Sequence, residues 1–421
     1  MSGNTIFDDL RSRSLLYDYT DEKSLKDLLL AGPVTLYHGI DPTQSSLHVG
    51  NLVGVLLAKR FQQAGHRPLL LLGGATGLVG DPSGRTSERN LLDVETLNDN
   101  IAGLQSQLSG LIDFDGTNAA RLVNNLDWTR SVTLIDFLRD IGKHVTVNQM
   151  LTKDSVRIRM AGSHGISFTE FTYMLFQAFD YQWLFKNFNC QLQVGGSDQW
   201  GNITAGIDLV RRLEGQAVHG LTWPLMTRAD GTKFGKTVDG AVWLDPKRTL
   251  PYEFHQYFIN TDDRDVQRLL LQLTLLPVSE IADIMANHSH EPHKRSAQGV
   301  LADEVCGLVH GHDTVKSVKL AAELLFGGTE FTGEALSAVQ GVVPETKISS
   351  SIVDALEPLV DMLAFSGVCS SKSEARRTIQ AGGIRVNGRR IRSADESVTP
   401  VVSRFLLLQR GRKLHHLFVL E

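Results

Sequence analysis

The sequence has 421 residues, of which 42% are hydrophobic and 21% are charged, and its formal net charge is −5 at pH 7. This composition is typical of a folded globular protein and excludes a wholly basic nucleic-acid coat, while the length predicts two or three domains. The widely spaced Cys190, Cys306 and Cys369 form no CxxC pair, so neither a zinc site nor a disulfide framework is expected. Without a signal peptide or a long apolar run in view, we expect a cytoplasmic protein with no membrane partner.

The first 220 or so residues alternate short apolar runs with helical patterns. Strands are expected at 34–37, 68–72, 121–124 and 191–194, and a helix at 47–64. Such alternation predicts the α/β fold class, with a Rossmann-like parallel sheet covered on both faces. Ligands of such sheets bind beyond the carboxyl ends of the strands, so residues 1–225 are expected to form a catalytic domain with its site there.

The remaining chain divides by composition. Residues 226–330 predict a loop connection with two lysines followed by an α-helical domain, and the glycines, Pro344 and serines of 331–351 indicate a linker. Residues 352–421 are expected to form a small α+β module. Its segment 372–413 holds eleven Lys and Arg against three acidic residues, a net charge of +8 in a chain whose total is −5.

The first motif runs from Tyr37 to Thr43 and continues at His48, where the predicted helix begins. His48 and Asn51 are three residues apart and share one helix face. A helix N-terminus attracts phosphate, and Gly50 would let a nucleotide approach the backbone closely. A helix N-cap with an unrelated histidine is the alternative interpretation.

The second motif, residues 73–85, is rich in glycine and follows a buried strand, but its spacing is not that of the dinucleotide fingerprint. Asp81 is its only acid and suits a cation such as an ammonium group. Arg85 and Arg89 follow as candidate phosphate ligands. A plain glycine-rich turn would explain the segment equally simply.

Two further motifs combine polar and apolar residues. Tyr173, Gln177 and Asp180 lie at i, i+4 and i+7 of a predicted helix among apolar neighbours, which indicates either a pocket wall or a solvent-facing stripe. In residues 193–202 a strand ends in Gly195-Gly196, and Asp198 could accept hydrogen bonds from ribose hydroxyls. An ordinary strand–turn–helix junction is the alternative for that segment.

The fifth motif contains Lys233, Lys236 and Thr237. It imitates a P-loop, but only three residues separate its glycines where a P-loop has four. A loop with two lysines suits the charge of departing pyrophosphate, although an exposed basic loop is an alternative. In the tail, a short arginine-rich helix and a hairpin with an Asn-Gly turn indicate an RNA-binding patch, or else a solvated charged face. Its candidate RNA ligands are Lys372, Arg376, Arg377, Arg385 and Arg389.

Together these motifs resemble the tyrosyl members of the class I aminoacyl-tRNA synthetases. His48-Val49-Gly50-Asn51 resembles the HIGH signature, Lys233–Thr237 resembles the KMSKS loop, and 371–390 resembles an S4-type RNA-binding domain. The resemblance covers nearly the whole chain and implies that tyrosine is activated with ATP and Mg²⁺, without an organic cofactor, and transferred to tRNA(Tyr). It also implies a homodimer.

The resemblance assigns a role to each motif residue. Tyr37 and Asp180 would bond the substrate phenol, and Asp81, Tyr173 and Gln177 its ammonium group. Gln193 and Asn125 would line the tyrosine and adenylate pocket. Contacts to the adenylate and ribose would come from Gly39, Asp41, Gly196 and Asp198. The triphosphate would meet Thr43, His48, Asn51, Gly50, Arg85, Arg89, Lys233, Lys236 and Thr237.

Three alternatives stay open. A tryptophanyl synthetase would share the class I motifs, but Tyr37, Asp180 and the S4-like tail weigh against it. A nucleotidyltransferase acting on a small phosphate ester would need neither the helical segment nor the basic tail. A non-catalytic RNA-binding relative would not need the two lysines of the loop.

Overall fold

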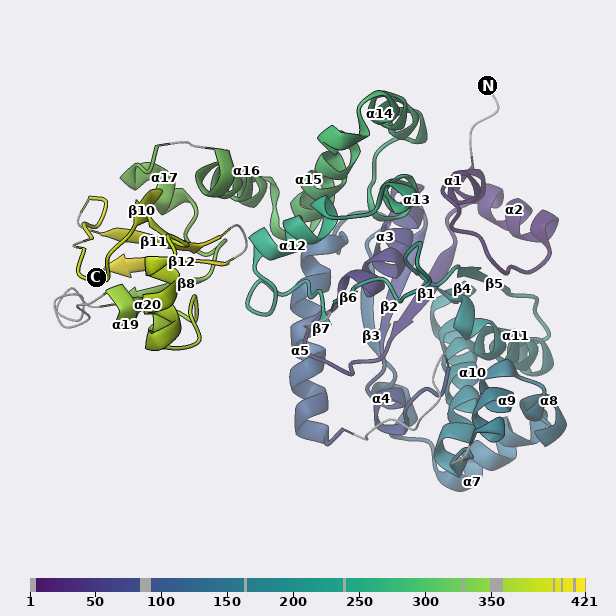
Figure 1. Cartoon of the computed structure of the whole chain (residues 1–421). Helices are drawn as coiled ribbons and strands as arrows, with labels where there is room; N and C mark the ends of the chain where they lie inside the picture. Colours follow the sequence, from purple (N-terminus) through teal and green to yellow (C-terminus); the bar gives the residue numbers. More distant parts are fainter. Residues whose placement is uncertain are drawn as a thin grey trace. The chain divides into compact units, whose positions relative to one another are not determined.

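The computed structural model describes residues 5–83, 92–162, 165–237, 240–327, 330–348, 359–396, 398–402, 404–411 and 414–420. The chain forms two compact units (Figure 1). The first comprises residues 1–244 and 262–297, and the second comprises 245–261 and 298–421. Among the described residues, no helix is both long and apolar enough to cross a membrane.

The first unit is built on a five-stranded parallel sheet in the order β3-β2-β1-β4-β5. Its strands are β1 (Thr35–Ile40), β2 (Arg67–Leu72), β3 (Arg121–Asn124), β4 (Cys190–Gly196) and β5 (His219–Trp223). β1 lies at the centre, with Tyr37 opposite both Leu69 of β2 and Gln193 of β4. The strand order reverses between β1 and β4, which is where ligands bind in sheets of this kind.

Helices cover both faces of this sheet (Figure 1). Because side chains alternate along a strand, Tyr37, Leu69 and Leu71 pack into a core with helices α10 (Phe168–Phe188) and α11 (Trp200–Glu214). Their neighbour His38 points to the other face, against Gly54 of α3 (Val49–Gln63). The other helices of this unit are α1 (Ile6–Ser12), α2 (Glu22–Ala31), α4 (Thr76–Val79), α5 (Val94–Leu111), α6 (Leu126–Thr129), α7 (Leu134–Asp136), α8 (Val147–Leu151), α9 (Asp154–Ala161), α13 (Asp263–Leu273) and α14 (Val278–His290).

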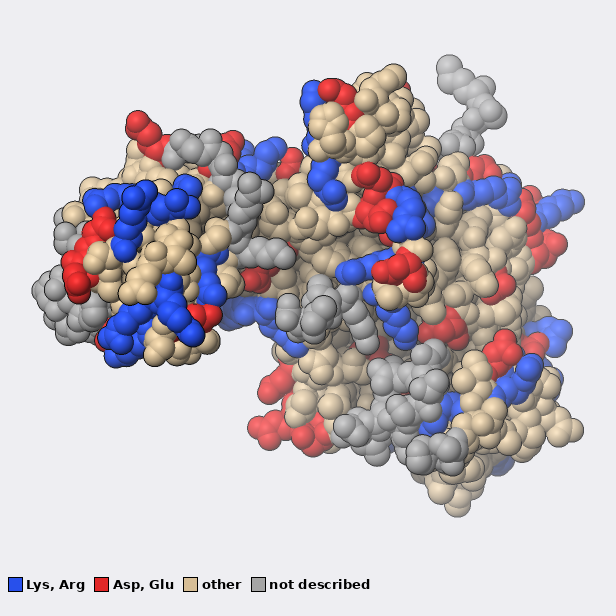
Figure 2. Space-filling model, in the orientation of Figure 1, with Lys and Arg blue, Asp and Glu red and all other residues tan. Residues whose placement is uncertain are grey.

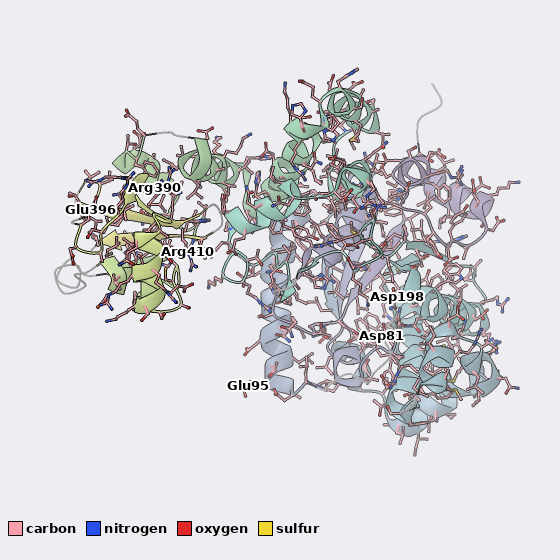
Figure 3. The ribbon with its side chains drawn as sticks, viewed as in Figure 1. Asp81, Glu95, Asp198, Arg390, Glu396 and Arg410 are labelled. Atoms are coloured by element: carbon pink, nitrogen blue, oxygen red, sulfur yellow. The ribbon has the colours of Figure 1, made fainter. Side chains whose placement is uncertain are left out.

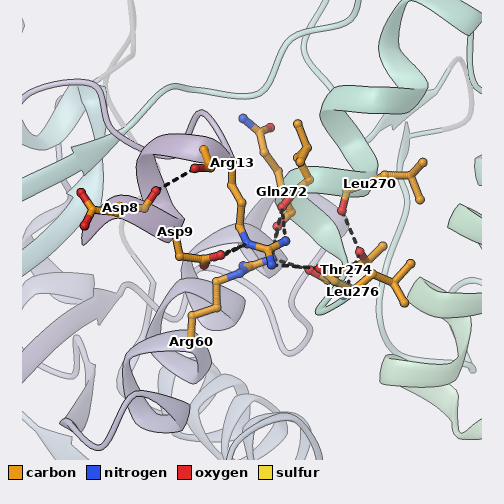
Figure 4. A network of polar contacts seen from close by, with 10 residues as sticks. Asp8, Asp9, Arg13, Arg60, Leu270, Gln272, Thr274 and Leu276 are labelled. Carbon is orange, nitrogen blue, oxygen red and sulfur yellow. Dashed lines mark hydrogen bonds and ion pairs between the residues drawn. The ribbon is translucent and has the colours of Figure 1, made fainter. Parts of the chain in front are cut away.

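Two buried arginines fix the C-terminal end of α13 (Figure 4). Arg60 of α3 donates to the carbonyl oxygens of Leu271, Gln272 and Thr274, and Arg13 donates to those of Leu271 and Leu276. Apart from that of Leu276, which follows the helix, these carbonyls are among those that a helix end leaves without an internal partner. Burial, together with the nearby charge of Arg13, lowers the pKa of Arg60 to about 9. The pair therefore joins α1 and α3 to α13.

The second unit contains a mixed sheet in the order β10-β9-β11-β12-β8, in which only the β12–β8 pairing is parallel. Its two faces carry separate apolar clusters. Its strands are β8 (Glu345–Ile348), β9 (Ile384–Val386), β10 (Arg389–Ile391), β11 (Phe405–Arg410) and β12 (Leu414–Leu420). Its helices are α12 (Pro251–Ile259), most of α15 (Ser296–His310), α16 (His312–Ala322), α17 (Gly333–Ala338), α19 (Leu359–Phe365) and α20 (Lys372–Gln380).

The parallel sheet and the helical segment agree with the sequence interpretation, but the expected linker at 331–351 was wrong. That segment forms α17 and β8, and β8 pairs with β12 in the register Glu345↔Leu417 to Ile348↔Leu420. Its glycines and serines resemble a linker locally, whereas its hydrogen-bond partner lies about seventy residues later. The expected domain boundaries at 225 and 352 also differ from those of the two units. The first unit runs to residue 244 and resumes at 262–297, while residues 245–261 belong to the second unit.

Candidate functional site

A cavity of about 300 Å³ lies at the carboxyl ends of β1 and β4. Its lining contains most of the site residues that the sequence predicts: Tyr37, Gly39, Asp41, Thr43, His48, Asn51, Asp81, Tyr173, Gln177, Asp180, Gln193, Gly196 and Asp198. The β1, glycine-rich, α10 and β4 motifs are separated by up to about 160 residues in sequence and meet here because the strand ends share one edge of the sheet. The polar stripe of α10 is thus a pocket wall, not a solvent-facing surface.

One part of the cavity combines a tyrosine hydroxyl with a carboxylate. Tyr37 is 1% exposed, and its hydroxyl makes no hydrogen bond to any residue that the structure describes. Burial raises the pKa of Tyr37 well above its usual value, and the nearby Asp180 charge raises it further. An unpaired buried hydroxyl is costly, so this arrangement favours a ligand that brings a polar group to this position.

The Asp180 carboxylate is fixed from behind by two buried residues. Trp128 of α6 donates from Nε1 to Oδ1 at 2.9 Å, and Asn125 donates from Nδ2 to Oδ2 at 3.0 Å. Burial raises the pKa of Asp180 to about 7, opposed by these two hydrogen bonds. Asn125 was expected in the pocket wall, but it is fully buried and lies outside the lining. The role of Trp128 had no local signal in the sequence.

Carboxamides surround the Asp81 carboxylate. Gln199 donates to Asp81 at 2.7 Å, Gln177 donates to Gln199 at 3.2 Å, and Asn202 donates to Gln177 at 3.0 Å. Asp198 lies close to Asp81 (Figure 3), and its pKa is raised, first by burial and then by the Asp81 charge. Two neighbouring carboxylates in one cavity favour a bound cation. Gln199 and Asn202 stand in the motif that pointed to Asp198, but sequence reasoning gave them no role.

Asp41, which follows β1, is held by side chains from two helices. Thr76 of α4 donates to Oδ1 at 2.9 Å, and the Tyr173 hydroxyl of α10 donates to Oδ2 at 3.1 Å. Gly73 is needed beside it, because a Cβ there would come within 2.3 Å of the Asp41 carboxylate. Tyr173, predicted to bind the ammonium group, therefore also contacts Asp41, which is predicted to bind the nucleotide. Thr76 belongs to the site as well, although the sequence did not predict it.

The N-terminus of α3 carries the HIGH-like motif. His48 is the N-cap, and Asn51 accepts its backbone N–H at 3.1 Å, so Asn51 also stabilises the first turn. Gly50 lies outside the cavity lining, and a Cβ on it would come within 2.9 Å of the His48 ring. This turn lies at the cavity edge and its dipole suits phosphate, although the N–H groups of Val49 and Asn51 already donate to the carbonyls of Val242 and His48.

The loop that carries Lys233 and Lys236 (the lysine loop, residues 230–237) and the residues that follow it pack on this same turn. The backbone N–H of Val49 donates to the Val242 carbonyl at 3.0 Å, and the rings of His48 and Trp243 lie 6.0 Å apart. Gly235, at φ +81°, lies so close that a Cβ would come within 2.8 Å of Val49. Two motifs that are separated by about 180 residues in the sequence are therefore in direct contact.

Of the residues predicted to meet the phosphates from this loop and from the glycine-rich segment, only Lys233 has a described side chain. Lys233 is exposed and lies outside the cavity lining, and its charge weakly opposes the rise in the pKa of Asp198 that burial and Asp81 cause. Lys236 and Thr237 form β6, which pairs with β7 (Gly240–Ala241), and their side chains lie outside the described part of the chain. Arg85 and Arg89 also lie outside the described residues.

The candidate RNA ligands lie in the second unit, where lysine and arginine side chains gather on the face shown in Figure 2. The Asn387-Gly388 turn joins β9 and β10 with positive φ at both residues, as its sequence predicts. Lys372 pairs with Asp361, and Arg389 pairs with Glu396. Arg376, Arg377 and Arg385 make no ion pair within the described residues, so they are the better placed to meet phosphate.

The comparisons with known proteins agree with this geometry. Residues 30–327 match the family described as tRNA synthetases class I (W and Y), and residues 336–418 match the tyrosine–tRNA ligase SYY-like C-terminal domain. The chain is 48% identical to the tyrosine–tRNA ligase of Anaeromyxobacter dehalogenans over 410 residues, 96% of each chain. It is also 48% identical to that of Opitutus terrae over 418 residues, 98% of each chain.

Solved structures show the same relationship. A C-terminally truncated mitochondrial tyrosyl-tRNA synthetase of Aspergillus nidulans has a TM-score of 0.70 and 34% identity, covering 76% of this chain and 94% of that one. The tyrosyl-tRNA synthetase of Archaeoglobus fulgidus, complexed with L-tyrosine, has a TM-score of 0.57 at 15% identity, a likeness of fold alone, covering 74% of this chain and 99% of that one. The chain belongs to the class I tRNA synthetases of the tryptophan and tyrosine family, among the tyrosine–tRNA ligases.

Proposed function

We propose that the chain activates L-tyrosine with ATP to form tyrosyl-adenylate and transfers the tyrosyl group to the 3′-terminal adenosine of tRNA(Tyr). The observation that carries this proposal is the unpaired, buried hydroxyl of Tyr37 beside the Asp180 carboxylate. A phenol satisfies both groups, because its oxygen accepts from Tyr37 while its own O–H donates to Asp180. Phenylalanine would leave the buried Tyr37 hydroxyl without a partner and Asp180 without the hydrogen bond from the ligand, an effect for which the tyrosyl enzyme is itself a standard example.

The amino acid's ammonium group would bind at Asp81, with Tyr173 and Gln177 beside it. Support comes from the closeness of Asp81 and Asp198, since the pKa of Asp198 is raised by burial and then by the Asp81 charge, and a cation would relieve that repulsion. The carboxamides around Asp81 fix the carboxylate before the ligand arrives. Gln193 lines the cavity on β4, directly opposite Tyr37 in register, which suits a role between the phenol and the adenylate.

The nucleotide would lie across the ends of β1 and β4. Asp41, Gly39, Gly196 and Asp198 line this part of the cavity, where carboxylates can accept hydrogen bonds from ribose hydroxyls. Thr43 and His48 lie at the edge beside the α3 N-terminus, which suits the triphosphate. Lys233, Lys236 and Thr237, with Arg85 and Arg89, are proposed to meet the pyrophosphate as its charge develops.

The chemistry requires no covalent nucleophile from the protein. A carboxylate oxygen of tyrosine attacks the α-phosphorus of ATP, the bond to the bridging oxygen breaks, and pyrophosphate leaves. A ribose hydroxyl of the terminal tRNA adenosine then attacks the tyrosyl carbonyl, AMP leaves with the mixed-anhydride oxygen, and the hydroxyl proton is released. The protein contributes by orienting the reactants and by placing positive charge where the pyrophosphate forms.

Mg²⁺ is proposed to enter with ATP. Within the described ranges, no three His, Cys, Asp or Glu side chains gather as a metal site. Mg²⁺ is commonly held by substrate phosphates with water and few protein ligands, so the chain's residues fit a metal carried by the triphosphate. The ion would neutralise phosphate charge when bound.

A homodimer is also proposed. Among the described residues from 134 to 168, seven large apolar side chains are more than half exposed: Leu134, Ile135, Leu138, Val147, Ile158, Met160 and Phe168. Phe168, at the start of α10, is 76% exposed. Apolar side chains gathered in one segment favour a protein interface, and a second copy is the simplest partner. Sedimentation should give a dimer that Phe168→Asp weakens, and a monomer at all concentrations would contradict it.

Amino-acid-dependent exchange of pyrophosphate into ATP tests the proposed function. Tyrosine should support exchange, whereas phenylalanine and tryptophan should not. Charging of tRNA(Tyr) transcript with labelled tyrosine tests the second step in the same preparation. Exchange with tryptophan alone would overturn the choice of amino acid, and exchange without charging would restrict the chain to adenylate formation.

A further inference from the structure

The HIGH-like start of α3 and the lysine loop are connected in two ways. In the direct connection, Gly235 of the loop lies against Val49, and the N–H of Val49 donates to the carbonyl of Val242. The second connection runs through α13, which is bonded at one end to the backbone before the loop and at the other end to α3. α3, the loop and α13 therefore form a closed ring of contacts.

The first turns of α13 bond the backbone that leads into the loop. The Asp265 carboxylate accepts the N–H of Ala229, and Arg268 donates to the carbonyl of Thr227. Asp265 and Arg268 also form an ion pair with each other, which orients both side chains toward this backbone. The position of the base of the loop therefore depends on where α13 lies.

The other end of α13 is bonded by Arg60, which lies about three helical turns after the start of α3 (Figure 4). Its Nη2 donates to the carbonyl oxygens of Leu271, Gln272 and Thr274. Arg60 is 4% exposed and makes no ion pair with any acidic residue in the part of the chain that the structure describes. Because all three acceptors are backbone atoms of one helix end, Arg60 fixes the position of that end relative to α3.

α13 can transmit position from one end to the other. It has 11 residues and is therefore about 16 Å long. Its apolar face is fully buried, at Val266, Leu269, Leu270 and Leu273. A helix whose face is packed in this way shifts as one body and does not bend locally, because the close-packed interior transmits displacement.

We propose that Arg60 is a positioning residue for the lysine loop. Through α13 it fixes the base of the loop relative to the N-terminus of α3, so that the loop and the helix start face the same phosphates. This inference rests on the proposed function, in which the loop meets the departing pyrophosphate. A displacement of about 1 Å that arises far from the chemistry can lower a rate about a hundredfold, so a shift of α13 is sufficient to impair catalysis.

The first experiment compares pyrophosphate exchange by the full chain and by Arg60→Met, which removes the donors but keeps a long side chain. kcat/KM for ATP should fall by about tenfold to a hundredfold, while KM for tyrosine stays within about twofold. Arg60→Lys should recover most of the loss, because an ammonium group still donates to the carbonyls. Lys59→Met is the matched control on the same helix, since Lys59 pairs with Asp113 instead. An equal rise in both KM values, or an equal loss in the control, would overturn the inference.

The second experiment combines Arg60→Met with Asp265→Ala, which act on opposite ends of α13. Losses from two sites that share no partner are expected to multiply. If both substitutions act through the position of α13, the loss of kcat/KM for ATP in the double variant should instead come close to the larger single loss. A double loss equal to the product of the single losses would overturn the inference.

Trypsin digestion of the folded proteins gives a readout that does not depend on activity. Lys233 is exposed, and cleavage after it should be at least about fivefold faster in Arg60→Met, because a loop with a displaced base opens more often. Cleavage after Arg211 of α11, which is also exposed, should keep its rate. Equal acceleration at both sites, or none at Lys233, would overturn the inference. Faster cleavage at Lys233 alone in a chain that exchanges no pyrophosphate would contradict the proposed function and leave the positioning by Arg60 in place.

Discussion

Trp128 donates a 2.9 Å hydrogen bond from its indole Nε1 to Oδ1 of Asp180, and so orients a carboxylate that lines the cavity. The indole is 5% exposed and stacks on Trp183 at a ring separation of 4.2 Å, which fixes its position. Because this hydrogen bond favours the charged carboxylate, it opposes the rise in pKa that burial causes. Trp128 therefore influences the protonation of Asp180, although Trp128 itself does not line the cavity.

Trp128→Phe should shift the pH dependence of tyrosine activation to higher pH. A hydrogen bond to a charged group contributes about 1.5–3 kcal/mol, which corresponds to about one or two pKa units. The pKa of Asp180 should then rise above its value of about 7, so kcat/KM for tyrosine falls at neutral pH and recovers at alkaline pH. The measurement is pyrophosphate exchange across this range. Trp183→Phe, which keeps the hydrogen bond, serves as the control, and identical pH profiles in both variants would remove Trp128 from this role.

Asp180→Asn should stabilise the fold increasingly as pH rises. The folded-state pKa of about 7 lies above the ordinary value of 3.8, so the native state holds the proton more tightly. The unsubstituted protein therefore loses stability as pH rises from about 4 to about 7, by up to about 4 kcal/mol in total. The carboxamide that replaces the carboxylate would lose a hydrogen bond to Trp128 or Asn125, but that cost does not vary with pH.

The test of Asp180→Asn is the Tm difference from the unsubstituted protein, measured at about pH 5 and about pH 8. The Tm of the variant relative to that of the unsubstituted protein should be higher at about pH 8 than at about pH 5. Tyrosine activation should be lost at both values. A constant difference would mean that the carboxylate is not protonated in the folded state near neutral pH.

Tyr37→Phe should weaken tyrosine binding without weakening the fold. The hydroxyl has no hydrogen-bond partner in the described residues, so its removal costs no internal bond. KM for tyrosine should rise by about fivefold to somewhat over a hundredfold, from the loss of about 1–3 kcal/mol, and discrimination against phenylalanine should fall. Tyr181→Phe is the matched control, since its hydroxyl donates to the His219 carbonyl at 2.7 Å and it should lose stability instead. A destabilised Tyr37→Phe with unchanged KM would contradict the proposal.

Strand-end motifs made much of the site predictable from sequence. Tyr37, Asp81 and Asp198 each follow or end a short apolar run, and parallel strand ends must meet at one edge. Trp128 was not predictable in this way, because its partner Asp180 lies 52 residues away on another helix and no spacing rule connects them. Gln199 was named in a motif, but its role depends on Asp81, 118 residues earlier.

In the second unit, too, local patterns were predictable from sequence and pairings between distant segments were not. The Asn387-Gly388 turn is local, so its hairpin was predictable, whereas β8 was interpreted as linker because its partner β12 is the last strand of the chain. This pairing also bears on how RNA binding by the second unit can be tested. Deleting residues 352–421 would remove four of the five strands of the mixed sheet and expose both apolar clusters. Point substitutions are therefore the sounder test of RNA binding.

A final prediction concerns the first turns of α13, which hold the start of the lysine loop by its backbone. Asp265 is 5% exposed, and its Oδ2 accepts the N–H of Ala229 at 2.8 Å. Arg268 pairs with Asp265 at 2.6 Å and donates to the carbonyl of Thr227. These backbone contacts lie four to six residues before Lys233, and the far end of α13 is fixed by Arg13 and Arg60. Asp265 and Arg268 are therefore expected to be positioning residues for the loop.

Asp265→Ala should lower kcat and raise KM for ATP by about tenfold each, because a misplaced charge stabilises the developing pyrophosphate poorly. KM for tyrosine should stay unchanged, since no described residue of the loop lines the cavity. Arg264→Ala is the control, because that side chain is 68% exposed and pairs with Asp262 on the same helix. A parallel rise in both KM values with a lower Tm would indicate a merely structural role. The split between the two substrates distinguishes positioning from stability, since only the nucleotide meets the loop.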